Sequence, residues 1–598
     1  MKASDRWHTM CKLKSYLILL CVFAVSTGTY GQEKRYQIGN STNVLSNFRR
    51  QLATLKPNGI NRLQLQLSST LSLPAVVSYR KSSGTASEQL IGSIANVPNS
   101  SFYLMIENKS VQGHILLRDS KKAYQYSSDN NGAVFIQETD INKVICTDYQ
   151  EAVQPVSTSV AAETTTAMST AALADLQSYP GGNGCVLLDF DGQYVSGTVW
   201  NGSGPIDAAP ANLSDADKQL TWELVSEAFR PLSLNITTSE AVFNTYPKTR
   251  RMRCIFTPTN TAAPGYGGVA YIESFRWNDD TPCWVFNTRG KAVGDAATHE
   301  IGHTLGLHHD GRPGEEYYGG QGNWAPVMGV GYYKPLVQWS KGEYTNANNR
   351  EDDLQIMTFM AFGVGYRADD HGNTTTAATL LTMDASGNVS NKGVIEWTAD
   401  VDMFSFSTSG GLANLTFNPN AYYPTLDILA TLYDHNGTVI TTSDPADLNA
   451  AISTTLAAGK YYVSVTGTGS GDPATTGYSN YGSLGTYNIT GTVPILILLS
   501  KDAGMPRKVD VTPLSKPVTS LVVSPNPAAN QVKLQYGKRD SYFDAKITDV
   551  TGAVVYSALH IQTGQIVNIA SLKTGSYFIT INTGKETITK KLIKQNAN

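Results

Sequence analysis

Four of the nine histidines in this 598-residue chain lie close together in the segment THEIGHTLGLHHD (298–310). Residues four apart on an α-helix share a face, so His299 and His303 would present their imidazoles to one point. Gly306 permits a backbone reversal that lets His309 return toward that point. Three neutral imidazoles leave a zinc ion with an open coordination position, which is typical of a catalytic site. The spacing therefore predicts a zinc centre with His299, His303 and His309 as ligands.

Glu300 and His308 lie in the same segment with different expected roles. On a helix Glu300 is rotated by about 100° from His299. It can therefore reach an attacking water without binding the metal, and we expect it to be the general base. The spacing selects His309 rather than His308 as the third ligand. The competing interpretation is a helix that carries histidines by chance.

A resemblance to a known clan strengthens the zinc interpretation. HEIGHTLGLHH resembles the extended zinc signature of the metzincin metallopeptidases, and WAPVMGVGYY (324–333) resembles their Met-turn. The resemblance implies that Met328 lies beneath the zinc. Some metzincins place a tyrosine ligand two residues after that methionine, but this chain has Val330 there. Tyr332 and Tyr333 come too late for that register, which favours the reprolysin-like branch.

The same resemblance implies the reaction and its cofactor. Zn²⁺ lowers the pKa of its bound water, while Glu300 takes the proton and returns it to the leaving amine. An extended substrate is expected to pair with an edge strand, assigned here to GYGGVAYIES (265–274). The implied partners are protein or peptide substrates, and the implied activity is that of a zinc metalloendopeptidase.

The elements that position this site fall within residues 175–366. Strand-like runs such as CVLLDFDG alternate with two helix-like segments, SDADKQLTWELVSEAF (214–229) and DAATHEIGHTLGL (295–307). Ser214 followed by Asp217 is a typical helix start. The pattern predicts an α/β metzincin-like catalytic domain.

The segments before this domain indicate export and latency. Residues 1–31 have a basic start and an apolar run, YLILLCVFAV, that falls short of the roughly 20 residues needed to span a bilayer, which predicts a signal peptide. Residues 32–174 show short alternating segments and end in a Ser/Thr/Ala-rich stretch. We therefore expect a β-rich propeptide and linker, a zymogen, and no membrane span after the signal is removed.

Two further β-domains are expected after the catalytic domain. Regular β-runs in residues 367–499 predict a β-sandwich, and they resemble the prepeptidase C-terminal domain of secreted bacterial peptidases. Residues 500–518 have the composition of a linker. Residues 519–598, with SPNPAANQVKL and LKTGSYFITI, resemble the C-terminal sorting domain of type IX secretion substrates. That resemblance implies the type IX secretion machinery as a partner and a secreted or cell-surface location.

The cysteines after the signal peptide allow several arrangements. Cys254 and Cys283 lie on expected strands of one domain and form the favoured disulfide. Cys146 has three alternatives: a buried thiol, a bond to Cys185, or a thiolate that blocks the zinc, as in several zymogens of the clan.

Composition limits the class of protein. Lysine plus arginine (46) nearly balance aspartate plus glutamate (49), for a formal net charge of −3. No polyanion-binding surface is indicated, and nucleic acid is not an expected partner. We expect a multidomain secreted enzyme with an α/β metzincin-like domain, a β-rich propeptide and two C-terminal β-sandwich domains. The rival is a surface adhesin with an ancillary metallo-domain, and the retained Glu300 favours the enzyme.

Overall fold

The structure is a computed structural model in which the chain forms two compact units, residues 1–497 and 498–598. The predicted signal peptide (1–31), much of the first linker and nearly all of the second lie outside the described residues. The described residues are 35–53, 62–68, 70–83, 87–107, 110–146, 173–286, 290–495, 518–526, 528–537, 542–549, 553–570, 572–583 and 587–595.

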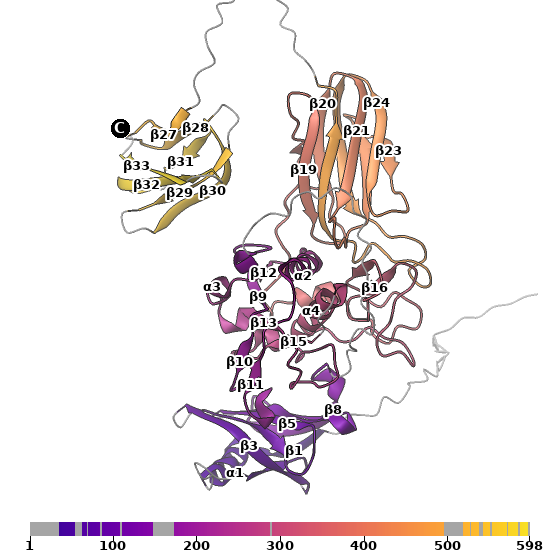
Figure 1. The fold of residues 1–598 in the computed structure, drawn as a ribbon, viewed down its shortest axis with the longest axis vertical. Helices are drawn as coiled ribbons and strands as arrows, with labels where there is room; N and C mark the ends of the chain where they lie inside the picture. Colours follow the sequence, from indigo (N-terminus) through magenta and orange to yellow (C-terminus); the bar gives the residue numbers. More distant parts are fainter. Residues whose placement is uncertain are drawn as a thin grey trace, which may run out of the picture. The chain divides into compact units, whose positions relative to one another are not determined.

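The N-terminal part is an antiparallel sheet with one helix (Figure 1). Its strands follow one another as a meander, in the order β1-β8-β7-β6-β5-β4-β3-β2. Helix α1 packs Val44 and Phe48 into the core of this sheet. The elements are β1 (Arg35–Asn40), α1 (Ser41–Ala53), β2 (Arg62–Gln66), β3 (Ser72–Ser83), β4 (Ser87–Ile94), β5 (Ser100–Glu107), β6 (Val111–Leu117), β7 (Lys122–Ser128) and β8 (Ala133–Asp140).

The central part is an α/β layer structure. Its sheet has the order β12-β9-β13-β15-β14, in which only the edge strand β14 runs antiparallel to its neighbour. Alternate residues of β9 face opposite sides: Val186 packs with the two long helices, while Leu187 packs with α3. The sheet and its helices comprise β9 (Gly184–Asp189), α2 (Asp215–Ala228), β12 (Leu234–Thr237), α3 (Glu240–Phe243), β13 (Arg251–Phe256), β14 (Gly268–Val269), β15 (Cys283–Val285) and α4 (Lys291–Thr304).

Local sequence accounts for how α2 begins and packs. The Ser214 hydroxyl accepts the Asp217 N–H and so caps the first turn, as the sequence predicts. Helix α4 crosses α2 closely at Gly294. A Cβ at this position would lie only 2.9 Å from the Leu224 side chain, so the crossing requires glycine. Smaller elements complete this part: β10 (Gln193–Val195), β11 (Ile206–Ala208), β16 (Trp324–Pro326), β17 (Leu336–Gln338) and α5 (Asp353–Met357).

A two-sheet sandwich follows the α/β part. One sheet has the order β18-β20-β25-β22-β23 and the other β19-β26-β21-β24. Inward residues such as Phe404, Phe417 and Val463 are fully buried between them. The strands are β18 (Thr379–Leu380), β19 (Asn388–Ile395), β20 (Asp402–Thr408), β21 (Gly411–Pro419), β22 (Ile428–Tyr433), β23 (Val439–Ser443), β24 (Ala450–Leu456), β25 (Gly459–Gly467) and β26 (Gly485–Thr492).

The sandwich shares a continuous apolar core with the α/β part. Hydrogen bonds reinforce this contact: Gln338 on β17 donates to the Thr425 carbonyl at 2.6 Å, and Leu354 N–H donates to the Tyr481 hydroxyl at 2.8 Å. The buried Glu227 carboxylate on α2 accepts the N–H of Thr486 at 2.7 Å. The two parts are therefore packed together rather than tethered.

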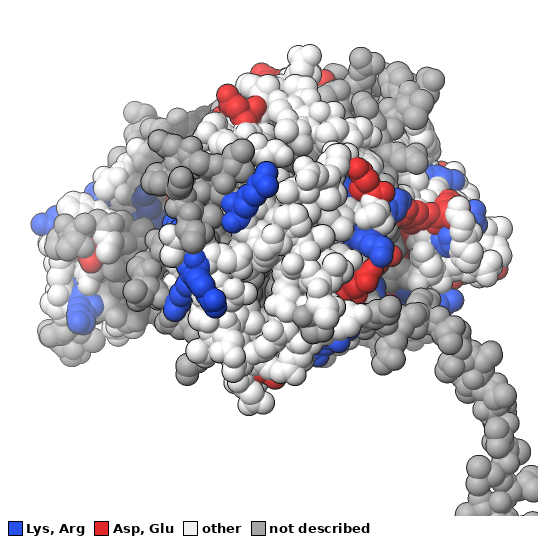
Figure 2. All heavy atoms as spheres, turned by 90° about the horizontal axis from the view of Figure 1, so that it is seen from below, with Lys and Arg blue, Asp and Glu red and all other residues white. Residues whose placement is uncertain are grey.

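The second unit is a smaller β-structure of two sheets, β27-β28-β31 and β30-β29-β32-β33. Its strands are β27 (Val518–Ser524), β28 (Gln531–Gly537), β29 (Tyr542–Thr548), β30 (Val554–Gln562), β31 (Ile566–Asn568), β32 (Gly575–Asn582) and β33 (Thr587–Lys594). The chain is therefore multidomain and rich in β-structure. Within the described residues, no helix is long and apolar enough to cross a membrane. On the face drawn in Figure 2, the lysine and arginine side chains are scattered, some of them beside aspartate or glutamate, and they do not form one basic patch.

Candidate metal centre

Helix α4 ends in a turn that brings a third histidine back to the first two. Gly306 has φ +95°, a left-handed conformation that disfavours residues with a Cβ. A Cβ at this position would also lie 2.9 Å from the Phe362 ring. The N–H of Gly306 bonds the His303 carbonyl at 2.9 Å, which closes the helix. The chain then turns so that His309 faces the helix.

The three imidazoles converge through their Nε2 atoms. His303 Nε2 lies 3.0 Å from His299 Nε2 and 3.0 Å from His309 Nε2. In two of the rings the opposite nitrogen faces a backbone carbonyl: His299 Nδ1 lies 3.0 Å from Val327 O, and His303 Nδ1 lies 2.8 Å from Leu307 O. His309 Nδ1 instead lies 3.9 Å from a carboxylate oxygen of Glu316. Burial is the main cause that holds the pKa of each of the three rings well below its usual value.

This arrangement fits a metal ion. A carbonyl only accepts hydrogen bonds, so His299 and His303 carry their protons on Nδ1 and direct bare Nε2 lone pairs at each other. Two lone pairs 3.0 Å apart repel unless a cation lies between them. Neutral imidazoles with Nδ1 bonded to carbonyls are the ligand form that zinc takes. Zinc therefore suits the group formed by His299, His303 and His309, with Cys146 Sγ within 4.8 Å of the ring nitrogens.

Glu300 lies beside the three rings and is fully buried. The edge strand passes directly over it, since a Cβ on Gly268 would lie 2.6 Å from Glu300 Oε1. Among the described residues, Oε2 has no hydrogen-bond partner. Burial is the main cause that raises the pKa of Glu300 well above its usual value. The carboxylate is thus enclosed between the edge strand and the sulfur of Cys146, which lies 3.8 Å from Oε1.

Met328 lies beneath the helix, as the resemblance implies. Its side chain is fully buried, and a Cβ on Gly302 would lie 2.8 Å from its sulfur. The Met328 carbonyl accepts the Asp310 N–H at 2.8 Å, which ties this turn to the residue after His309. Gly302, in the middle of the histidine motif, therefore has a packing role as well as a place in the spacing.

Three residues weighed in the sequence lie apart from the converging ring nitrogens. His308 Nδ1 lies 3.0 Å from Glu351, and that carboxylate also faces the His308 N–H at 3.3 Å. Tyr332 is buried, whereas the side chain of Tyr333 is 58% exposed. The ring centroids of the two tyrosines lie 6.3 Å apart.

A segment of the N-terminal part crosses the metal centre. Ile145 pairs with Tyr271 in antiparallel fashion, and the Cys146 N–H donates to the Ala270 carbonyl at 3.0 Å. The Ile272 N–H donates to the Val144 carbonyl at 3.1 Å. This pairing falls within the 265–274 segment expected to bind substrate. It places Cys146 Sγ 3.8 Å from Glu300 Oε1.

Sequence reasoning missed Tyr317, which forms another wall of the centre. Its hydroxyl lies 3.8 Å from Cys146 Sγ, and its ring centroid lies 4.3 Å from that of His309. Burial is the main cause that raises the pKa of Tyr317 well above its usual value. The loop after His309 contains two adjacent tyrosines, 317 and 318, and nothing in their spacing singles out the first.

The predicted Cys254–Cys283 disulfide is wrong, and so is the alternative bond from Cys146 to Cys185. The four cysteines among the described residues all carry thiols. Cys254 and Cys283 are in register on neighbouring parallel strands, but the Cys283 thiol is 3.8 Å from the Arg253 carbonyl, to which it donates. Cys185 packs with Leu187 and Phe243 on the far side of the sheet, away from Cys146 in the cleft.

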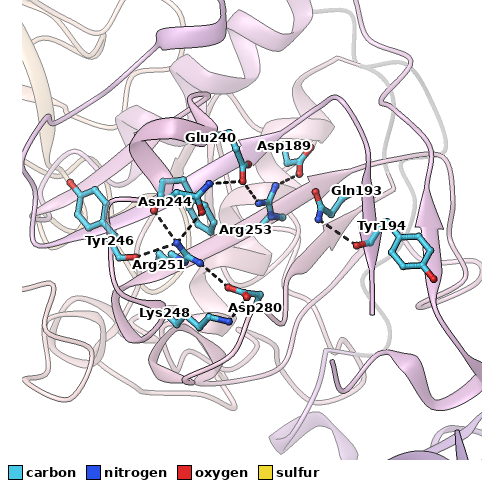
Figure 3. Close-up of polar contacts among 11 residues, drawn as sticks. Asp189, Gln193, Tyr194, Glu240, Asn244, Tyr246, Lys248, Arg251, Arg253 and Asp280 are labelled. Carbon is cyan, nitrogen blue, oxygen red and sulfur yellow. Dashed lines mark hydrogen bonds and ion pairs between the residues drawn. The ribbon is translucent and has the colours of Figure 1, made fainter. Parts of the chain in front are cut away.

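That far side of the sheet holds a separate polar cluster (Figure 3). Arg253 bridges Asp189 at 2.5 Å and Glu240 at 2.7 Å, and Arg251 bonds Asp280 at 3.0 Å. Both guanidinium groups also lie over the Phe243 ring. These opposite charges are already paired with one another, so the cluster joins α3 and nearby loops to the sheet.

Comparisons with known families support the interpretation of this centre. Residues 232–310 match the family described as "Metallo-peptidase family M12B Reprolysin-like". The match begins two residues before β12 and ends at Asp310, so it includes the three histidines and Glu300. Residues 522–595 match the "Secretion system C-terminal sorting domain". This domain indicates export by type IX secretion to the cell surface or the extracellular space.

Two solved structures match about a fifth of this chain each, at low identity. The pre-peptidase C-terminal domain of a collagenase from Bacillus anthracis is 14% identical, over 21% of this chain and 100% of that one, with a TM-score of 0.15. The lysozyme inhibitor PliG from Aeromonas hydrophila is 11% identical, over 19% of this chain and 95% of that one, also with a TM-score of 0.15. Among curated proteins, none matches this chain in sequence.

Proposed function

We propose that this secreted metallopeptidase, with its reprolysin-like domain and type IX sorting tail, is a zinc endopeptidase made as a zymogen. The observation that carries the proposal is the convergence of three imidazole Nε2 atoms beside a buried carboxylate. His299, His303 and His309 would hold the zinc. When bound there, zinc would activate a water and polarise the substrate carbonyl.

Glu300 is the proposed general base. Its carboxylate is next in sequence to the ligand His299 and is fully buried, and burial raises its pKa. It would accept the proton of the attacking water and then return that proton to the leaving amine. The nearby edge strand would hold the substrate extended, because its backbone groups at 270 and 272 already bind a chain in that manner.

Tyr317 is proposed to assist the same step. Its hydroxyl contacts the sulfur that lies among the ring nitrogens, so it faces the volume where substrate must sit. Burial keeps the phenol protonated, and a neutral phenol is a hydrogen-bond donor. It would donate to the substrate oxygen as negative charge develops there.

Latency would come from the N-terminal part. Residues 144–146 occupy the strand edge that substrate needs, and the Cys146 sulfur lies within 4.8 Å of the three histidines. A thiolate is a good zinc ligand, so Cys146 would fill the position that water takes in the active enzyme. Activation would then require both the strand pairing and the sulfur contact to be broken.

The test is Glu300→Ala in the matured, secreted protein, assayed by peptide cleavage and by zinc analysis of the same sample. We expect zinc to stay near one ion per chain, because all three imidazoles remain. Cleavage should fall by about 10⁴-fold or more, since one residue serves both proton transfers.

Glu351→Gln is the matched control. That carboxylate also lies near the histidine segment, but it faces His308 rather than the converging nitrogens. The control should keep zinc and activity within about tenfold. If Glu300→Ala keeps activity within tenfold of the native protein at full zinc occupancy, Glu300 is not the base.

A further inference from the structure

A second group of converging side chains lies at the root of the sandwich. Oxygen atoms of Asp369, Glu396 and Asp400 lie within 4.8 Å of one another. A neighbouring group brings Asp370 and Asp402 together within the same limit. Five carboxylates from two stretches of chain thus gather in one small region. One stretch, 369–370, precedes β18, and the other, 396–402, runs from the end of β19 into the start of β20.

Two fully buried members of this acidic cluster have carboxylate oxygens that no donor contacts among the described residues. Glu396 is fully buried, and both of its carboxylate oxygens are without a partner among the described residues. Asp402 is equally buried, and its Oδ1 is likewise unpartnered. A buried carboxylate with no donor is costly, so each of these oxygens calls for a ligand.

Nearby basic groups do not fill that role. The Arg367 guanidinium lies over the Tyr179 ring, 4.2 Å from its centroid. Both ring nitrogens of His371 are engaged, Nδ1 with Thr379 at 2.9 Å and Nε2 with the Lys392 carbonyl at 2.9 Å. His371 is therefore not available as a nitrogen ligand, and the available donors are carboxylate oxygens.

Burial and mutual repulsion disfavour the charged form of these carboxylates when no cation is bound. Burial first, then the neighbouring acids, raises the pKa of Glu396 to about 10. For Asp402 the same causes raise the pKa to about 9, although Tyr487 donates a hydrogen bond to it at 2.6 Å. At neutral pH the acids must either hold protons or share a positive ion.

We propose that this cluster is a calcium site, with Asp369, Glu396 and Asp400 as carboxylate ligands. Calcium takes several oxygen ligands in flexible geometry and accepts both oxygens of one carboxylate, which suits the paired unpartnered oxygens of Glu396. Magnesium demands stricter octahedral geometry and keeps its waters, which a buried carboxylate opposes. Zinc prefers nitrogen and sulfur, which this cluster does not offer.

The site lies where the chain leaves the α/β part, so the ion would act on that joint. Arg367 N–H donates to the Pro231 carbonyl at 2.8 Å, and Tyr366 forms an isolated bridge with Leu232. Asp369 follows two residues after Arg367. A calcium ion there would link this exit segment to the loop between β19 and β20, and so fix the root of the sandwich.

The experiment uses the full chain in calcium-free buffer with zinc supplied. Calcium alone is added, and binding is measured by titration calorimetry while unfolding is followed by scanning calorimetry. The native chain should bind calcium and unfold at a temperature that rises with calcium concentration. Magnesium at equal concentration should raise it less.

The variant Glu396→Gln tests whether Glu396 binds calcium or only supports the fold. It keeps the shape of the side chain but removes one buried charge. Without calcium the variant should unfold at or above the native temperature, and its calcium affinity should fall at least about 10- to 100-fold, the range seen when supporting groups around a metal are lost. Asp369→Asn, at the exposed rim, gives a second reading if Glu396→Gln fails to fold.

Asp447→Asn is the matched control, since Asp447 is an exposed acid of the same sandwich outside the cluster. It should keep native calcium binding. The proposal is overturned if the native chain binds no calcium, or if Glu396→Gln and Asp369→Asn gain as much stability from calcium as the native chain.

Discussion

The metal centre and the acidic cluster both bring ligand atoms together, but the ligands are neutral in the first and negatively charged in the second. In each, ligand atoms that are mostly buried converge on one point. At the centre the ligand atoms are neutral nitrogens, and backbone carbonyls hold the far sides of His299 and His303, so these two ligands are oriented before a metal arrives. In the cluster they are carboxylates that repel one another. The first arrangement is suited to a catalytic ion with an open position, and the second to an ion that holds structure together.

Removal of a nitrogen ligand should give the largest effect. His303→Ala should lose the zinc and, with it, all measurable cleavage, because two imidazoles cannot hold the ion as three do. Calcium should still stabilise the sandwich in this variant. Elemental analysis and calorimetry of one sample check both statements. His308→Ala is the control and should keep its zinc; full zinc in His303→Ala would show that the ligand set is wrong.

The next effect concerns the wall of the centre that carries Tyr317. Tyr317→Phe removes a donor but keeps the ring against His309, so zinc should stay bound. The value of kcat should fall by about 10²- to 10³-fold, as when one oxyanion donor is removed, with little change in KM. Tyr333→Phe, at an exposed position, should change neither. A rise in KM with kcat unchanged would assign Tyr317 to substrate binding.

Latency gives a smaller effect. Cys146→Ala in the uncleaved chain should raise peptide cleavage by about tenfold, the change that corresponds to about 1.4 kcal/mol of binding. The rise should be partial because the backbone pairing with residues 270 and 272 remains. Cys185→Ala, on the far side of the sheet, should leave the chain latent. Equal latency in both variants would mean that the strand pairing alone blocks the site.

The smallest effect concerns a buried histidine outside the metal centre and its influence on how stability changes with pH. His114 is buried against Tyr271, with ring centroids 5.0 Å apart, and its Nε2 is unpartnered among the described residues. Burial lowers its pKa to about 3. The unfolded chain binds a proton near pH 6.5, so stability should be full above that pH and should fall as pH drops toward 3.

The slope from this one group is at most about 1.4 kcal/mol per pH unit. His114→Leu should flatten the fall between pH 6.5 and pH 4 in calorimetric scans and should not alter zinc content. His435→Gln, in the sandwich rather than in the N-terminal sheet that holds His114, should leave the fall unchanged. An identical pH profile in His114→Leu would show that this ring takes a proton while folded.

Much of the architecture could be predicted from local patterns. Ser214 and Asp217 start α2 where the sequence places a helix, and the run CVLLDFDG does form a strand, β9. The disulfide prediction failed for a reason that sequence does not contain. Register alone would permit a bond between Cys254 and Cys283, but the side chain of Cys283 is directed to a backbone carbonyl.

By itself the sequence determined the histidine group, because its members lie within eleven residues and helix geometry is periodic. Spacing alone therefore indicates which rings can meet. Only the tertiary structure brought Tyr317 and Cys146 to that group, since one lies on a loop and the other is 154 residues from Glu300. It also gathered Asp369, Glu396 and Asp400, whose separations follow no helical or strand period. Such contacts depend on how loops and layers pack, which no local pattern encodes.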